Sequence, residues 1–99
     1  MHALTRALLP ALAVLLVAGC HRKVTQSQCD TLVDHYAELA MKEQFPDAAP
    51  ADIDSQKKKV REESKNDDDF KNCTSEIETA DFDCAMKATT TDAIERCLE

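Results

Sequence analysis

The sequence predicts an all-α protein: a small disulfide-stapled helical hairpin followed by a short C-terminal helical pair. The 99 residues include a single glycine, and after residue 24 no run alternates β-branched with polar residues as a strand would. Apolar residues between Cys29 and Ala40 recur with the spacing of an amphipathic helix. Only 4% of the residues are aromatic, so the core is thin, and the five cysteines offer covalent stabilisation in its place.

Residues 1–19 have the layout of a secretory signal peptide. Arg6 supplies a positive charge near the amino terminus, and residues 7–17 form an uncharged run rich in leucine and alanine. A membrane-spanning helix needs about twenty apolar residues, and the polar residues from His21 onward end this run too early. We therefore expect a signal that is removed, not a helix that crosses the membrane.

The signal ends in the sequence Leu16-Val17-Ala18-Gly19-Cys20. This junction resembles the lipobox of bacterial lipoproteins, in which an aliphatic residue and two small residues precede the cysteine that receives the lipid. The resemblance implies that Cys20 becomes the mature amino terminus and carries a thioether-linked diacylglycerol, usually with a further acyl chain such as palmitate. At about 0.8 kcal/mol per buried methylene, two or more chains anchor a protein durably to a bilayer.

The number of cysteines supports the same assignment. Removal of residues 1–19 leaves an odd number of cysteines, and an unpaired thiol is a liability in an oxidising compartment. Assigning Cys20 to the lipid leaves Cys29, Cys73, Cys84 and Cys97 for two disulfides, for which three connectivities exist. The preferred pairing is Cys73 with Cys84, which closes a short turn, and Cys29 with Cys97, which ties down the terminus.

The resemblance also implies a localisation. In many Gram-negative bacteria an aspartate after the lipidated cysteine retains a lipoprotein in the inner membrane, and His21 occupies that position here. The resemblance therefore favours the outer membrane. Residues 20–28 are expected to form the lipidated cysteine and a flexible tether with a reach of about 15 Å.

A strongly acidic domain is expected to follow over residues 29–99. From Val24 onward the sequence has 19 acidic and nine basic residues, a formal charge of −10. Such a body is repelled by anionic head groups and should stand away from the membrane. The charge also excludes nucleic acid as a partner, because no basic surface is available to neutralise phosphates.

The first two helices are predicted to form the hairpin. The periodic apolar positions place the first helix over residues 28–44, and Phe45-Pro46 ends it because proline disfavours helical geometry in the residue before it. Pro50 suits the first turn of the next helix. That helix is expected over residues 51–72, with few large apolar side chains and many charges.

Two shorter helices are predicted at the C-terminus. The sequence Ser75-Glu76-Ile77-Glu78 fits a capping box and predicts that a third helix begins there and continues to about residue 88. Residues 89–92 are expected to form a turn with capping hydroxyls. A terminal helix is then predicted over residues 93–98.

The sequence offers little support for catalysis or cofactor binding. The carboxylates among residues 57–69 could attract a cation, but the glycine of a calcium loop is missing, and a solvated helix face is the preferred explanation. The cysteine spacings do not suit zinc, and no C-x-x-C sequence suggests redox or haem chemistry. His35 lies beside the apolar stripe without a nucleophile and is interpreted as a boundary residue. We therefore predict no enzyme activity, no metal and no cofactor.

Two functional hypotheses follow. The first is a noncatalytic envelope lipoprotein, held to the bilayer through Cys20, that acts as an interaction or scaffolding module for an envelope protein of unknown identity. The four-cysteine body resembles, in general style, small helical lipoproteins of Gram-negative envelopes without assigned activity, a likeness that transfers no site. The second is a freely secreted, disulfide-bonded helical protein such as an inhibitor or toxin.

Overall fold

The structure is a computed structural model that describes residues 22–68 and 70–99. The expected signal peptide (1–19), Cys20 and His21 lie outside these residues. The described chain contains the helices α2 (Gln26–Gln44), α3 (Pro50–Ser64), α4 (Cys73–Glu76), α5 (Thr79–Lys87) and α6 (Thr91–Leu98). The predicted all-α class, with a helical hairpin and a C-terminal helical pair, is confirmed.

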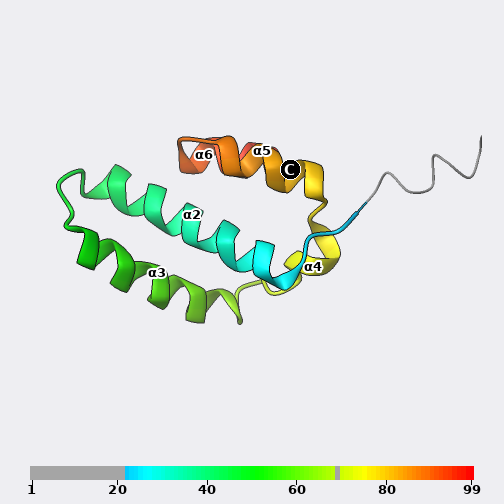
Figure 1. Cartoon of the computed structure of the whole chain (residues 1–99), viewed down its shortest axis with the longest axis horizontal. Helices are drawn as coiled ribbons and strands as arrows, with labels where there is room; N and C mark the ends of the chain where they lie inside the picture. The colour runs from blue at the N-terminus through cyan, green and yellow to red at the C-terminus, as the bar shows by residue number, and fades with distance from the viewer. Residues whose placement is uncertain (1–21, 69) are drawn as a thin grey trace, which may run out of the picture.

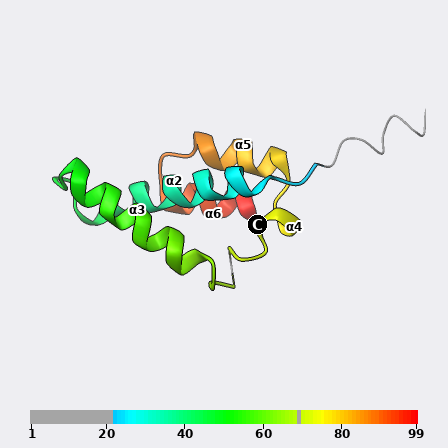
Figure 2. The same ribbon diagram turned by 60° about the horizontal axis from the view of Figure 1, so that its bottom comes forward.

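Helix α2 is the central element of the fold. Helix α3 runs antiparallel to it on one side, and α5 and α6 pack on the other (Figure 1). The view in Figure 2 shows α6 lying along α2, with α3 diverging from the pair. Since α3 packs against no other described helix, the α2–α3 hairpin forms one arm of the molecule.

The beginning of α2 is fixed by a capping box. The backbone N–H of Gln28 donates to Thr25 Oγ1 at 3.2 Å, and the backbone N–H of Thr25 donates to Gln28 Oε1 at 2.9 Å. Both bonds satisfy amides that the first turn leaves without helical partners. The helix therefore begins at Gln26, two residues before its predicted start.

The core lies between α2 and the C-terminal helices. Leu32 of α2 and Ile94 of α6 are fully buried, and Val24, Ile77 and Ala85 pack around them. Helix α3 contributes no buried residue. The burial of apolar surface that stabilises the domain therefore comes mainly from α2, α5 and α6.

Ion pairs hold much of α3 against α2. Arg61 of α3 pairs with Asp34 of α2. Lys57 lies 3.8 Å from Glu38, which also pairs with Lys42 at 3.2 Å. The hydrogen bond from Lys42, together with the charge of Lys57, lowers the pKa of Glu38. Since these side chains are partly exposed, each pair stabilises the hairpin only modestly.

The predicted extent of the second helix, to residue 72, is wrong: α3 ends at Ser64. The following segment turns back toward α2, where the Phe70 ring packs 6.1 Å from the Tyr36 ring. A run of aspartates has low helix propensity, and the segment finds more stabilisation in returning to the core than in extending the helix. A long-range contact thus determines where this helix ends.

The predicted capping box at Ser75 is also wrong. Ser75 lies inside the short helix α4, and its hydroxyl donates to the Asn72 carbonyl at 2.9 Å. Ile77 is extended, and α5 begins at Thr79 with Glu78 as its N-cap residue. The predicted single helix is divided here because the backbone around Ile77 pairs with the segment before α2.

Helix α6 begins two residues before the predicted start. The side chain of Thr90 accepts from the Ala93 amide at 3.1 Å, as expected for a hydroxyl in the capping turn. Glu43 of α2 adds a second cap, since its carboxylate accepts from the Thr91 amide at 3.0 Å and from the Thr91 hydroxyl at 2.7 Å. These bonds lower the pKa of Glu43. Helix α6 is thereby tied to the end of α2.

Candidate functional site

The segment that follows the expected lipidation site is part of the folded domain. The Thr79 amide donates to the Arg22 carbonyl at 2.9 Å, and the Val24 amide donates to the Ile77 carbonyl at 3.0 Å. Between these bonds, Lys23 forms an antiparallel bridge with Glu78. Their side chains form an ion pair at 3.8 Å.

This pairing corrects the expected tether for residues 22–28, the part of it that the structure describes. Val24 is 4% exposed and belongs to the core, and α2 has begun by Gln26. From Arg22 onward the chain is therefore held by the domain. In the sequence, a single residue, His21, separates Cys20 from Arg22.

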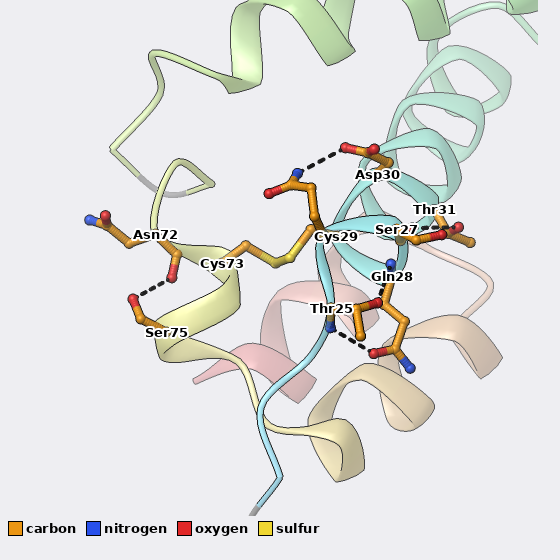
Figure 3. Close-up of a disulfide and its surroundings, with 10 residues drawn as sticks. Thr25, Ser27, Gln28, Cys29, Asp30, Thr31, Asn72, Cys73 and Ser75 are labelled. Carbon is orange, nitrogen blue, oxygen red and sulfur yellow. Dashed lines mark hydrogen bonds between the residues drawn. A yellow bond between two sulfur atoms is a disulfide. The ribbon is translucent and has the colours of Figure 1, made fainter.

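The first disulfide joins Cys29 in the first turns of α2 to Cys73 at the beginning of α4, with 6.1 Å between the Cα atoms. Figure 3 shows it beside the capping box of Thr25 and Gln28. Both sulfur-bearing residues are 3% exposed. The bridge therefore fixes the returning chain beside the point at which the amino-terminal segment joins the fold.

The second disulfide joins Cys84 of α5 to Cys97 of α6, with 5.7 Å between the Cα atoms. These two helices form the C-terminal pair (Figure 1). The bridge ties the last turn of the described chain to α5 and so stabilises a pair of helices of nine and eight residues.

The prediction that these four cysteines form two disulfides is confirmed, but the preferred pairing of Cys73 with Cys84 and Cys29 with Cys97 is wrong. The extended residue Ile77 places α4 and α5 on separate paths, so Cys84 does not fold back over Cys73. Each bridge instead closes its own antiparallel unit, the long hairpin or the C-terminal pair.

His35 and Tyr36 connect α2 to the C-terminal segment. The Nε2 atom of His35 is 2.9 Å from the Ala88 carbonyl, to which it must donate. The Tyr36 hydroxyl donates to Glu95 at 3.1 Å, and burial together with this bond raises the pKa of Tyr36. Both side chains thus hold helices together, and the boundary position expected for His35 is where the structure places it.

A groove of about 440 Å³ lies between α2, the end of α3 and the segment after it. It is lined by three basic side chains, those of Arg61, Lys65 and Lys71. Each of them pairs with a carboxylate, on Asp34, Glu62 and Asp68 respectively. Because the positive charge is compensated locally, this groove has no strong preference for an anion.

The turn between α2 and α3 carries the large apolar side chain that is most open to solvent in the described chain: Phe45 is 56% exposed. It borders a groove of about 500 Å³ that is lined by residues of the turn and of both helices: Met41, Gln44, Phe45, Pro46, Asp47, Ala48 and Asp52. From the sequence, Phe45 is predicted only to mark the end of a helix. An aromatic residue next to a proline in a polar loop was the available signal.

Neither a membrane span nor a metal site emerges from the part of the chain that the structure describes. No described helix is long and apolar enough to cross a membrane. No group of three or more histidine, cysteine or acidic side chains in residues 22–68 and 70–99 is arranged to hold a metal ion. The arrangement defines a small helical domain whose cysteines have structural roles.

Comparison with known protein families, curated proteins and solved structures finds no match to this chain.

Proposed function

We propose that this protein is an envelope lipoprotein, anchored in the outer membrane through acylated Cys20. Its helical domain acts as a noncatalytic interaction or scaffolding module. The observation that carries the proposal is the position of the fifth cysteine. Cys20 follows the lipobox-like sequence Leu16–Gly19 directly, while the other four cysteines are paired with one another.

The backbone pairing of Arg22 supports the proposal that the domain is anchored at its amino-terminal end. Backbone pairing from Arg22 onward connects the domain firmly to the segment that would carry the lipid. Two peptide units between Cys20 and Arg22 span at most about 7 Å. A lipid on Cys20 would thus hold this end of the domain close to the bilayer, while the acidic body is repelled from the head groups.

The noncatalytic part of the proposal is supported by the use that the fold makes of its reactive groups. The four cysteines outside the lipobox form two bridges: Cys29–Cys73 is buried, and Cys84–Cys97 joins an exposed cysteine to a half-buried one. His35 is engaged by a main-chain carbonyl, and the Tyr36 hydroxyl by Glu95. These side chains serve the packing of helices, which suits a rigid binding module.

Metabolic labelling with a radioactive fatty acid tests the anchor. We expect the wild-type protein to incorporate label and to fractionate with outer membranes, and Cys20→Ser to lose both properties. Cys20→Ser leaves the other four cysteines unchanged, so its oxidised domain is the control for folding. A soluble, unlabelled wild-type protein would favour the alternative of a freely secreted inhibitor or toxin.

A further inference from the structure

We propose that the turn between α2 and α3 is a docking surface for a partner protein that presents an apolar side chain surrounded by lysine or arginine. The surface, which we call the hairpin tip, consists of Met41, Gln44, Phe45, Pro46, Asp47, Ala48 and Asp52. This inference rests on the proposed function, because it assigns the interaction surface of the scaffolding module.

The centre of the hairpin tip is apolar and accessible. Phe45 is 56% exposed, whereas Leu32 and Ile94 are wholly buried. A single exposed apolar side chain is ordinary on a protein surface. Here, however, Phe45 borders a groove of about 500 Å³ together with Met41 and Pro46. An aromatic side chain beside a groove is the kind of group that dominates the energetics of protein interfaces.

The backbone of the hairpin tip is held in one shape. The Phe45 amide donates to the Met41 carbonyl at 2.8 Å, and the Ala48 amide donates to the Phe45 carbonyl at 3.0 Å. Pro46, within the turn closed by the second bond, and Pro50, which follows it, further restrict the chain. Little conformational freedom is therefore lost when a partner binds, which favours affinity.

The rim of the groove is acidic. Asp47 and Asp52 line it, and no basic side chain does. No ion pair involves either carboxylate among the described residues. Asp52 lies in the first turn of α3, where a negative charge is favourable, but Asp47 precedes the helix and has no such role. The complementary surface therefore carries basic side chains.

The same charge disfavours two other occupants. A bilayer with anionic head groups would be repelled by Asp47 and Asp52. A second copy docked tip to tip about a twofold axis would place identical carboxylates opposite one another. A partner protein with an apolar side chain and surrounding basic side chains is complementary to both the apolar groove and its acidic rim.

The position of the hairpin tip suits this role in an anchored protein. It lies at the opposite end of α2 from Arg22 (Figure 1). The 19 residues of α2 rise about 28 Å along the helix axis. An anchor at the Arg22 end would leave the hairpin tip at the far end of α2, away from the point of attachment.

Site-specific photo-crosslinking in the producing cells tests the proposal on the full chain. A benzophenone amino acid replaces Phe45 in one variant, and Lys59 of α3 or Asp83 of α5 in two controls on other exposed surfaces. We expect the probe at position 45 to crosslink another protein, and mass spectrometry to map the crosslink to a segment rich in lysine or arginine. Asp47→Lys should reduce that product several-fold, and the matched charge reversal Asp54→Lys should leave it unchanged.

The other outcomes overturn the proposal in distinguishable ways. A crosslink from position 45 to a second copy, to lipid, or to a segment without basic residues contradicts the assigned partner, as does a product insensitive to Asp47→Lys. If only position 59 or 83 crosslinks a protein, the hairpin tip is not the docking surface, but the proposed scaffolding function stands. If no position crosslinks a protein, the docking surface and the interaction role both fail, while the anchor at Cys20 is decided separately by the labelling experiment.

Discussion

A single carboxylate connects the end of the long hairpin to the last helix. Glu43 of α2 accepts two hydrogen bonds from Thr91, at the first turn of α6, where helix amides lack partners and favour negative charge. The cap is contributed by a residue 48 positions away. It therefore stabilises tertiary structure as well as α6.

We predict that Glu43→Gln lowers the melting temperature at neutral pH, because the neutral amide is a weaker acceptor at a helix amino terminus. The pKa of Glu43 in the folded protein lies below its usual range, since Thr91 donates to the ionised carboxylate. The contribution of Glu43 to the stability of the folded protein is therefore complete above the usual carboxyl pKa. It is lost as the pH falls through the lowered pKa that Glu43 has in the folded protein.

Melting followed by circular dichroism over an acid series measures this effect. The melting temperatures of wild type and Glu43→Gln should converge at low pH, whereas Glu63→Gln, which alters an exposed carboxylate of α3, should follow the wild type throughout. A difference between wild type and Glu43→Gln that stays constant with pH would contradict the charged cap.

The hydroxyl side chains of Thr25 and Ser75 have different roles in the structure. Thr25 accepts from the third amide of α2, whereas Ser75 donates to a carbonyl within α4. We predict that Thr25→Ala lowers the free energy of unfolding by about 1 kcal/mol, and Ser75→Ala by less than about 0.5 kcal/mol. Urea unfolding at equilibrium measures both changes. A larger loss for Ser75→Ala than for Thr25→Ala would contradict these assignments and would favour a capping role for Ser75.

At the scale of elements, each disulfide closes one antiparallel unit. The bridge Cys29–Cys73 spans 44 positions of the sequence and Cys84–Cys97 spans 13. In the chain-entropy description, loops of these sizes correspond to about 4 and about 3 kcal/mol. The first bridge should therefore stabilise the fold more.

We predict that replacing Cys29 and Cys73 together by serine lowers the free energy of unfolding more than replacing Cys84 and Cys97 together. Denaturant unfolding of the two double variants measures the difference. Proteolysis of the oxidised protein without reductant should release linked peptides for these two pairs alone. A peptide linking Cys29 to Cys97, or Cys73 to Cys84, would contradict the connectivity.

The accuracy of the sequence predictions depended on how local the determining interactions are. The apolar period within α2 and the proline signals around Pro50 act over a few residues, and α2 and the start of α3 lie close to where they were predicted. The break at Ile77 depends on pairing with Val24, far earlier in the chain. No local pattern contains that information, so the third helix and the disulfide pairing were predicted incorrectly.

The features of the candidate site also divide into those that local sequence predicts and those that depend on tertiary packing. The predicted helices contain Cys29, Cys84 and Cys97, as the observed ones do, because helical periodicity is a local property. Cys73 lies in α4, a short helix that was not predicted. The accessible groove at Phe45 arises because the long hairpin extends beyond its buried stretch, which depends on how the helices pack. The cap from Glu43 to Thr91 likewise requires the tertiary fold.

At the scale of the whole molecule, a thin core makes the covalent bridges decisive. The large side chains buried completely in the described chain are Leu32 and Ile94. With about 2–4 kcal/mol lost per bridge, reduction of both should bring the domain near its stability threshold. We predict that reductant greatly diminishes the helical circular dichroism signal at physiological temperature, and that the oxidised protein shows no alkylation of these four cysteines. Persistent helix after full reduction would contradict this dependence.

The paired segment at Arg22 and the hairpin tip lie at opposite ends of α2, with the ion-paired α3 on one side of this helix and the C-terminal pair on the other (Figure 1). If Cys20 carries the lipid, this arrangement would make the domain a spacer between a bilayer and a partner. The proposed role therefore depends on the lipid at Cys20.

Mass spectrometry of the mature amino terminus tests that dependence most directly. The account predicts a mature chain that begins at Cys20 and whose amino-terminal peptide carries the added mass of a diacylglyceryl group with or without a further acyl chain. An unmodified amino-terminal peptide, or one that begins at a different residue, would contradict the lipoprotein assignment.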